Sequence, residues 1–490
     1  MLPSHEMRAL RSGLMVSIAA SICSVAVSAR ADEPVAASEP RLMSESAEIT
    51  SVVDAFDKDD PFDLHLMLGF SQQWKSANIR RETALFQPGL TTGGFVARTE
   101  NVAKFNQSLS TLNVGADVGF YKDFALVIRL PIILSDSRGL SDLDGSSKNP
   151  QRLQDPQGAQ LFKADHQSPT RSGVDWFSVG LDWAIFNQQR DFTKPTWVVG
   201  VEGRFGIGPS LHACNANAPA GTPQCPDPVN PTINRDPGIS RGMNAVGAHT
   251  VFSKRYGYVE PYTGFNFLAE FAQDRGDFGA TNNLNGALVN HPPLLGTFTM
   301  GLEVIPYEHR EQFQRLIADF RVSGTYHSPG REYSELFDAL GSSQAPSLRS
   351  PNPTAYMRNP AATADPSTQS IADPQSQKAY FTGITDQQAF GSVSAHASAT
   401  WQAGEYIKFQ AGLGFTFNQS HLVTSADACN PNFADNLDKS GPCRTTGPVG
   451  GNATGIPNPN HRAVIDLPGH RFSVDDTVIT HLWVSGIVMF

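Results

Sequence analysis

His396 and Ser398 have the spacing that comes nearest to a catalytic arrangement in this sequence. Residues two apart on an extended chain lie on the same face, so an imidazole there could act as the base for a serine nucleophile. The alternating residues are mostly small and apolar, which turns both side chains toward the polar side of a strand: Val393, Ala395, Ala397, Ala399 and Trp401. A histidine and a serine two apart on a polar face are mostly coincidence, so we expect no enzymatic activity.

Two cysteine pairs and one acidic turn are the other candidates for chemistry. Cys214 with Cys225, and Cys429 with Cys443, lie close together in polar stretches. Neither pair has C-x-x-C spacing and no histidine pair accompanies them, which disfavours zinc. The Asp-Leu-Asp-Gly stretch at 142–145 lacks the other ligands and the distal glutamate of a calcium loop. We therefore expect no metal and no cofactor.

The elements that position these residues are strands. Residues 404–418 alternate strictly, with Ile407, Phe409 and Leu413 on one face and Lys408, Gln410 and Gly412 on the other. Such period-2 alternation recurs along the chain and is the signature of barrel strands. It predicts about twelve strands, at 62–75, 106–121, 124–135, 173–187, 195–207, 241–254, 257–272, 294–306, 312–327, 387–402, 404–418 and 475–490.

The N-terminus predicts export. Arg8 and Arg11 precede an apolar run over 14–27, and 29–31 reads Ala-Arg-Ala, an A-x-A cleavage site. We divide the chain into a cleaved signal peptide (1–31), an acidic periplasmic leader (32–60) and a barrel (61–490). In an exported chain the two cysteine pairs predict local disulfides in loops.

The charge balance excludes one class of partner. Removing Arg8, Arg11, Arg30 and Glu6 with the signal from 37 basic and 47 acidic residues leaves 34 and 46, a net charge of −12. Nucleic acid needs a basic face, so we expect no nucleic-acid partner. The rest of the chain contains no run of eighteen apolar residues, so no membrane-spanning helix is expected.

Short and long connections alternate between the predicted strands, which is typical of a transmembrane antiparallel up-and-down barrel with short periplasmic turns and long extracellular loops. The chain also ends on an alternating apolar stretch, VSGIVMF, with Phe490 last. In hydrocarbon every backbone group has to be paired, so the sheet must close and the last strand is structural. A soluble β-sandwich would need a polar exterior, whereas one face of these strands is nearly free of charge.

On these features the sequence resembles bacterial outer-membrane β-barrel proteins of the porin and transport-barrel type, without the motif of a single family. The stretches FALVIRLPI and YGYVEPYTGF look similar to outer-membrane transport barrels, including those associated with aromatic-compound degradation. The resemblance implies the outer membrane of a Gram-negative bacterium, lipid around the barrel, and the barrel assembly machinery as a partner during biogenesis, with Phe490 as the assembly signal. An outer-membrane phospholipase has a related His-x-Ser pair, but the rest of its pattern does not follow Ser398.

If the apolar face meets lipid, the polar face lines the lumen. The residues predicted to line the pore are Asp117, Arg129, Asp182, Glu202, Arg204, Glu260, Glu303, Asp319, Arg321 and Lys408. They could line a wet passage, or pair with one another and fill the interior. The leader could be disordered, enter the lumen as a plug, or bind a periplasmic partner. The loop at about 328–386 could cover the barrel mouth or be long and mobile.

Two functions follow from these alternatives. The first is a passive or facilitated channel for small solutes through a polar, charged lumen. The second is a non-conducting barrel that serves as an outer-membrane anchor, or as part of an envelope-spanning assembly for motility, adhesion or secretion. In the second case the leader and the long loops would bind a periplasmic or surface protein. Fold alone does not choose between the two.

Overall fold

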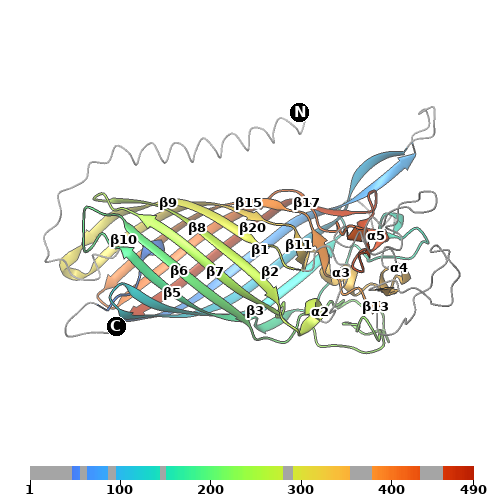
Figure 1. Cartoon of the computed structure of the whole chain (residues 1–490), viewed down its shortest axis with the longest axis horizontal. Coiled ribbons are helices and arrows are strands. Elements are labelled where there is room, and N and C mark those ends of the chain that lie inside the picture. Colours follow the sequence, from blue (N-terminus) through green and yellow to red (C-terminus); the bar gives the residue numbers. More distant parts are fainter. Residues whose placement is uncertain are drawn as a thin grey trace.

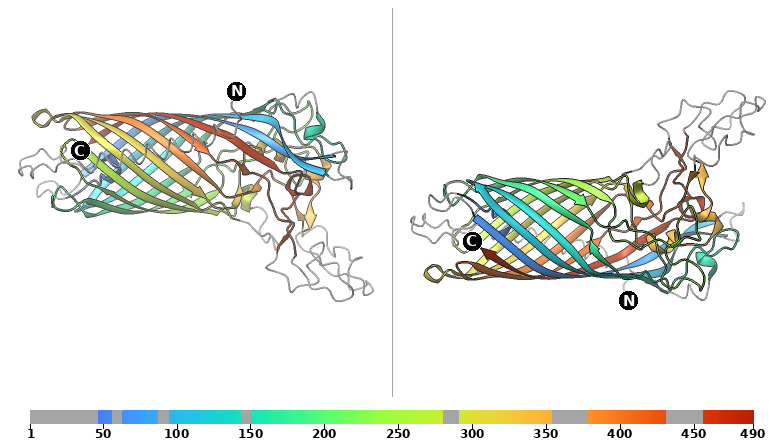
Figure 2. Two further views of the ribbon diagram at one scale, coloured as in Figure 1. Left: turned by 90° about the horizontal axis from the view of Figure 1, so that it is seen from above. Right: turned by 90° about the horizontal axis from the view of Figure 1, so that it is seen from below.

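The computed structural model describes residues 47–55, 63–86, 95–143, 150–279, 291–353, 378–430 and 456–490. Twelve antiparallel strands, each paired with the next along the chain, form a barrel that closes where β20 pairs with β1 (Figures 1 and 2). The wall consists of β1 (Asp63–Phe86), β2 (Phe95–Tyr121), β3 (Phe124–Ser141), β5 (Trp176–Phe186), β6 (Thr196–Gly206), β7 (Met243–Ser253), β8 (Val259–Ala272), β9 (Leu295–His309), β10 (Gln314–His327), β15 (Phe390–Gly404), β16 (Ile407–Asn418) and β20 (Phe472–Met489). The predicted all-β barrel of about twelve strands is confirmed.

The outer surface of the barrel is apolar. Val201, Val246 and Val484 are exposed to 55%, 58% and 54%, and large aromatic side chains such as Phe267 and Phe409 alternate with inward-facing residues in the same way. Exposing this much apolar surface to water is unfavourable, whereas a closed sheet with an apolar outer band suits hydrocarbon. The chain is therefore an outer-membrane β-barrel.

The chain end is part of the wall. The amide of Phe490 donates to the carbonyl of Leu64, 2.9 Å away, and the amide of Leu64 donates back to Phe490 over 3.2 Å. In register, β20 pairs with β16 on one side and β1 on the other. The terminal apolar stretch is thus the strand that closes the barrel, as the alternation predicted.

β1 and β2 run farther than predicted and form a hairpin that projects beyond the barrel (Figure 1). Their outer halves reverse the apolar pattern: Ala77 and Ile79 face inward and are buried, while Asn78 and Arg80 take the outward positions. Outside the membrane the outward face meets water, so it does not need to be apolar. A prediction based on an apolar outward face therefore makes these two strands too short.

The long loops gather at the end of the barrel opposite to the C-terminus (Figure 1). Apolar residues from different loops pack there into one core that includes Ile79, Leu153, Leu336, Ile465 and Phe472. We call these packed loops the cap. A smaller apolar core beside it contains Leu211, Phe278 and Phe337.

Short elements complete the described chain. The strands are β4 (Arg171–Val174), β11 (Gly330–Glu332), β12 (Asn352–Pro353), β13 (Lys378–Ala379), β14 (Thr385–Gln387), β17 (His421–Leu422), β18 (Cys429–Asn430) and β19 (Ile456–Pro457). The helical turns are η2 (Glu48–Thr50), η3 (Pro150–Leu153), α2 (Gly276–Gly279), η4 (Arg310–Gln312), α3 (Phe337–Gly341), α4 (Pro346–Arg349) and α5 (Ala463–Asp466). No helix in the described ranges has the length and apolar character needed to cross a membrane.

Candidate functional site: the lumen and its two closures

Part of the predicted leader lies inside the barrel. Residues 47–55, which include η2, enter at the short-turn end (Figure 1). The amide of Ala47 donates to Glu260 and the amide of Glu48 donates to Glu303, both over 2.9 Å. The ammonium of Lys408 donates to the Glu48 carboxylate over 3.1 Å. The leader segment is therefore held by three residues that the sequence placed on the pore wall.

The two glutamates explain why a backbone segment binds here. Glu260 and Glu303 are direct register partners on β8 and β9, and Asp319 on β10 is the next partner in the row. Three neighbouring carboxylates repel one another in a poorly hydrated interior. Both glutamates are 1% exposed, so the two leader amides supply hydrogen bonds that water would otherwise provide.

A glycine on the wall admits the leader backbone. A Cβ at Gly119 would lie 2.1 Å from the carbonyl oxygen of Asp54, so only glycine permits this approach. Ala55 forms a β-bridge with Lys122 in the turn that follows β2, and Arg190 donates to Asp54 over 2.8 Å. The leader segment is thus bound to the wall by specific contacts at the short-turn end.

The other predicted pore residues also lie on the inner face, and most of them are paired. Arg204 donates to Glu202 over 3.0 Å, and Asp182 faces His249 at 3.5 Å. Arg129 forms a bidentate pair with Asp117, with one contact at 2.9 Å. Arg204 therefore neutralises Glu202 within β6, and Arg129 on β3 neutralises Asp117 on the neighbouring β2.

A third group joins Asp319, Arg321 and Tyr262. The guanidinium of Arg321 donates to the Tyr262 hydroxyl over 2.9 Å and to Asp319 over 3.2 Å, and the Tyr262 hydroxyl donates to Asp319. The ring of Tyr262 lies over Gly301, where a Cβ would be 2.3 Å from the ring. The sequence gives no sign that Tyr262 joins this group, because its position opposite Gly301 depends on how β8 and β9 pair.

The structure leaves a cavity between the leader and the wall, of about 650 Å³. Six of the ten predicted pore residues line it: Asp117, Arg129, Asp182, Asp319, Arg321 and Lys408. The other four predicted pore residues do not line the cavity. Glu202 and Arg204 are paired with each other on β6, and Glu260 and Glu303 bind the leader. A space of this size fits a small solute.

His396 and Ser398 line the same cavity. No hydrogen bond joins them, although both face inward from β15. Among the residues that the structure describes, no three histidine, cysteine, aspartate or glutamate side chains are grouped as metal ligands.

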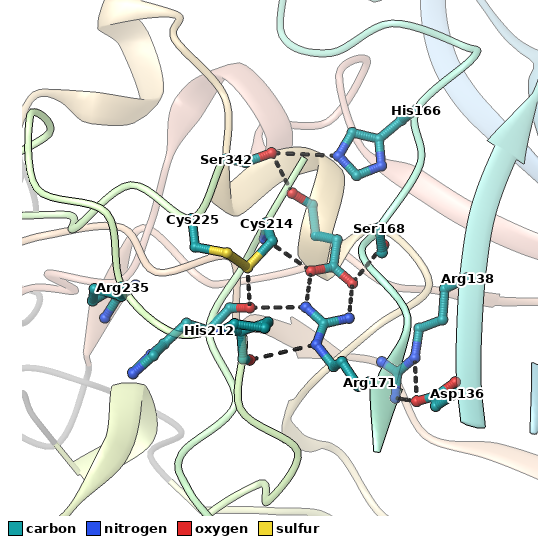
Figure 3. Close-up of polar contacts among 12 residues, drawn as sticks. Asp136, Arg138, His166, Ser168, Arg171, His212, Cys214, Cys225, Arg235 and Ser342 are labelled. Carbon is teal, nitrogen blue, oxygen red and sulfur yellow. Dashed lines mark hydrogen bonds and ion pairs between the residues drawn. A yellow bond between two sulfur atoms is a disulfide. The ribbon is translucent and has the colours of Figure 1, made fainter. Parts of the chain in front are cut away.

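The cap lies at the opposite end, and polar contacts join its loops in addition to the apolar core (Figure 3). The guanidinium of Arg171 donates to both carboxylate oxygens of Asp338, at 2.6 and 3.1 Å. Ser168 and the amide of Cys214 donate to the same carboxylate at 2.9 and 3.0 Å. Burial by itself would raise the pKa of Asp338, but the charge and hydrogen bonds of Arg171 outweigh it and hold that pKa below its usual value.

The predicted disulfide between Cys214 and Cys225 is present (Figure 3). It closes a turn within the loop after β6, and Cys214 ties that loop to α3 through Asp338. For the second predicted pair, Cys443 lies outside the described residues, so the pairing with Cys429 stays a prediction. The predicted signal peptide at 1–31 and the leader residues 32–46 and 56–60 also lie outside them.

No family model matches the chain, and no curated protein sequence matches it. Among solved structures, an outer membrane channel from Pseudomonas putida F1 is 8% identical and has a TM-score of 0.36 over 87% of this chain and 95% of that chain. A FadL homologue from Pseudomonas aeruginosa is 10% identical, with a TM-score of 0.30 over 87% and 90%. The toluene transporter TodX of P. putida is 8% identical, with a TM-score of 0.29 over 92% and 93%. These similarities are too distant to assign a solute.

Proposed function

We propose that this barrel is a gated channel for small solutes, closed at its periplasmic end by residues 47–55 and at its outer end by the cap. The observation that carries the proposal is the leader segment, which is bound to the wall by backbone amides beside a cavity of about 650 Å³. A barrel with a purely structural interior needs neither a separate segment in its lumen nor a space beside it.

The binding of the leader is strong enough to close the channel and weak enough to be reversed. Each hydrogen bond between an amide and a carboxylate is worth roughly 1.5–3 kcal/mol. A few such contacts, opposed by the entropy of ordering nine residues, leave a small net free energy. An equilibrium between closed and open states then lies within reach of a solute or a periplasmic partner.

Single-channel conductance in a planar bilayer tests the proposal. Gly119→Leu places a side chain where the Asp54 carbonyl lies, 2.1 Å from the Cβ position, and should raise the open probability of the refolded protein. Gly324→Leu is the matched control, because a Cβ at Gly324 meets no atom within 4 Å. In the open state Arg321→Ser and Glu303→Ser should shift the ion preference in opposite directions.

A specific observation favours a second candidate. The outer loops bury a large apolar core that links hairpin β1–β2 to loops far away in the sequence, which is more order than connecting loops need. Such a cap could be the binding surface of a non-conducting anchor. If both the Gly119→Leu variant and a variant lacking residues 47–55 form heat-modifiable barrels but neither conducts, the channel proposal is wrong. The cap should then be used in pull-down experiments to identify surface partners.

A further inference from the structure

One side of the lumenal cavity is basic and aromatic. Arg321 on β10 is the register partner of His396 on β15, His396 pairs with Gly414, and Gly414 pairs with His481 on β20. A guanidinium and two imidazoles therefore lie in one row across four neighbouring strands. All three side chains line the cavity, together with Trp483. We call Arg321, His396, His481 and Trp483 the basic shelf.

Glycines shape the shelf. The centre of the His481 ring lies 5.1 Å from that of Trp483, with the rings 25° from parallel, and His396 lies 5.8 Å away on the same indole. A Cβ at Gly412 would be 2.2 Å from the indole, and one at Gly414 would be 3.0 Å from the His396 ring. The indole therefore lies close to the wall beside both imidazoles, and it also lines the cavity.

The shelf has hydrogen-bonding capacity that the protein does not use. Among the described residues, neither imidazole forms a hydrogen bond or an ion pair, and the indole N–H has no acceptor. Arg321 shares its guanidinium between Tyr262 and Asp319. Polar groups that face a cavity without partners are the usual mark of a ligand site.

The charges around the shelf do not cancel it. Beside it on β10 lies Asp319, which Arg321 and Tyr262 engage. The other acidic groups on the cavity are already paired: Asp117 with Arg129, Asp182 with His249, and Glu48 with Lys408. The remaining ionisable group on the cavity is His65 of β1, which has its own interaction. When the imidazoles are protonated, the shelf therefore has an excess of positive charge.

We propose that the basic shelf binds a small organic carboxylate whose flat apolar body lies on Trp483. A carboxylate accepts hydrogen bonds from a guanidinium and from imidazolium groups, and these charge-assisted bonds are stronger than bonds between neutral groups. The indole face offers a contact for a planar body. This inference names a solute class for the channel and rests on the proposed function.

The test is titration calorimetry of the refolded protein in detergent, with benzoate as the probe. Benzamide has the same ring without the charge, and acetate has the charge without the ring. Benzoate should bind about tenfold or more tightly than benzamide, because benzamide lacks the charge that strengthens the hydrogen bonds. It should also bind more tightly than acetate, because acetate lacks the ring that contacts Trp483. Its affinity should rise as the pH is lowered, because protonation turns the imidazoles into cationic hydrogen-bond donors.

Paired variants locate the site. The double variant His396→Gln with His481→Gln should weaken benzoate binding about tenfold or more and abolish its pH dependence. These two side chains have ring contacts with Trp483 but no hydrogen bonds or ion pairs to lose, so the fold should persist. His309→Gln removes an exposed imidazole at the end of β9 and should bind benzoate like the natural protein.

Equal binding of benzoate and benzamide would overturn the proposal, and so would unchanged binding in the double variant. Access is checked by repeating the titration in Gly119→Leu, and absence of binding in both backgrounds also overturns it. Failure of the channel is seen separately. Benzoate binding without conductance in any variant would retain the shelf and reject the channel, whereas conductance without benzoate binding would retain the channel and reject the shelf.

Discussion

The ion pair between Arg171 and Asp338 offers a direct test of whether the outer loops are a folded cap. The Arg171 side chain is 0% exposed and that of Asp338 is 7% exposed. The perturbation is Asp338→Asn, which keeps the shape of the side chain but removes its charge. We expect the cap to open more often while the barrel stays intact, because none of the three groups that donate to this carboxylate belongs to the membrane wall.

The magnitude follows from burial. Removing one partner of a buried ion pair typically costs about 3–5 kcal/mol, because the other charge is left uncompensated. Arg171 keeps two hydrogen bonds, to the carbonyls of His212 at 2.9 Å and of Pro237 at 3.4 Å, and an asparagine oxygen can still accept one bond. We therefore expect a loss of cap stability at the lower end of this range, about 3 kcal/mol. Such a loss raises the population of the open cap more than a hundredfold.

The same pair gives the cap a pH dependence of known sign. Arg171 and the Cys214 amide hold the pKa of Asp338 below its usual value. A carboxyl group whose pKa is lowered in the folded state contributes stability above its unfolded pKa of about 3.9, and this stability is lost as the pH falls through the folded pKa. The difference between the natural protein and Asp338→Asn should therefore shrink as the pH falls below about 4.

Hydrogen exchange measured by mass spectrometry separates the two parts of the molecule. Amides in 330–349 should exchange faster in Asp338→Asn, and those in β7 should not. Asp165→Asn, an exposed acid in the same loop as Ser168, is the control. Arg171→Met combined with Asp338→Leu should recover much of the protection, since no charge is then left buried. If the asparagine variant exchanges as slowly as the natural protein, the cap does not depend on this pair and our account of its order is wrong.

Two further predictions concern the cap and the wall. Replacing Cys214 and Cys225 by serine should cost the cap about 3 kcal/mol, the loop-closure value for a bridge of this span, and exchange in the loop after β6 should rise while barrel melting stays the same. Val484→Arg, on the lipid face, should lower the free energy of unfolding of the barrel by about 2–4 kcal/mol, measured by guanidinium unfolding from liposomes. Ser485→Arg, on the lumenal face, should lower it clearly less, and equal losses would contradict the assigned faces.

The barrel could be predicted because lipid imposes a simple rule. Every second residue of a wall strand has to be apolar, and residues such as Phe409 and Leu413 show this directly in the sequence. The rule ends at the membrane surface, which is why the outer halves of β1 and β2 were missed. There Ala77 and Ile79 face the cap core and the outward face is polar.

The two closures could not be predicted because their partners are far apart and follow no period. In the leader, Ala47 contacts Glu260, which is 213 residues farther along the chain, and Glu48 contacts Glu303, which is 255 residues farther along. The cap core joins Leu153, Leu336 and Ile465 from separate loops. The sequence could propose a plug and a cover for the mouth among several alternatives, but only the folded chain brings these residues together.

The inner glycines distinguish a lined passage from a filled interior. A side chain that fills a barrel extends toward the axis from its own strand, and its neighbours do not need to be small. Here large inward residues lie sideways over glycines of the next strand: Tyr262 over Gly301 and Trp483 over Gly412, where a Cβ would be 2.3 and 2.2 Å away. His249 approaches Gly200 equally closely, at 2.2 Å. Each glycine lets a ring lie against the wall, so the bulk of these residues is kept away from the axis. The leader segment then occupies space that the wall itself leaves open, which is the arrangement that a removable plug requires.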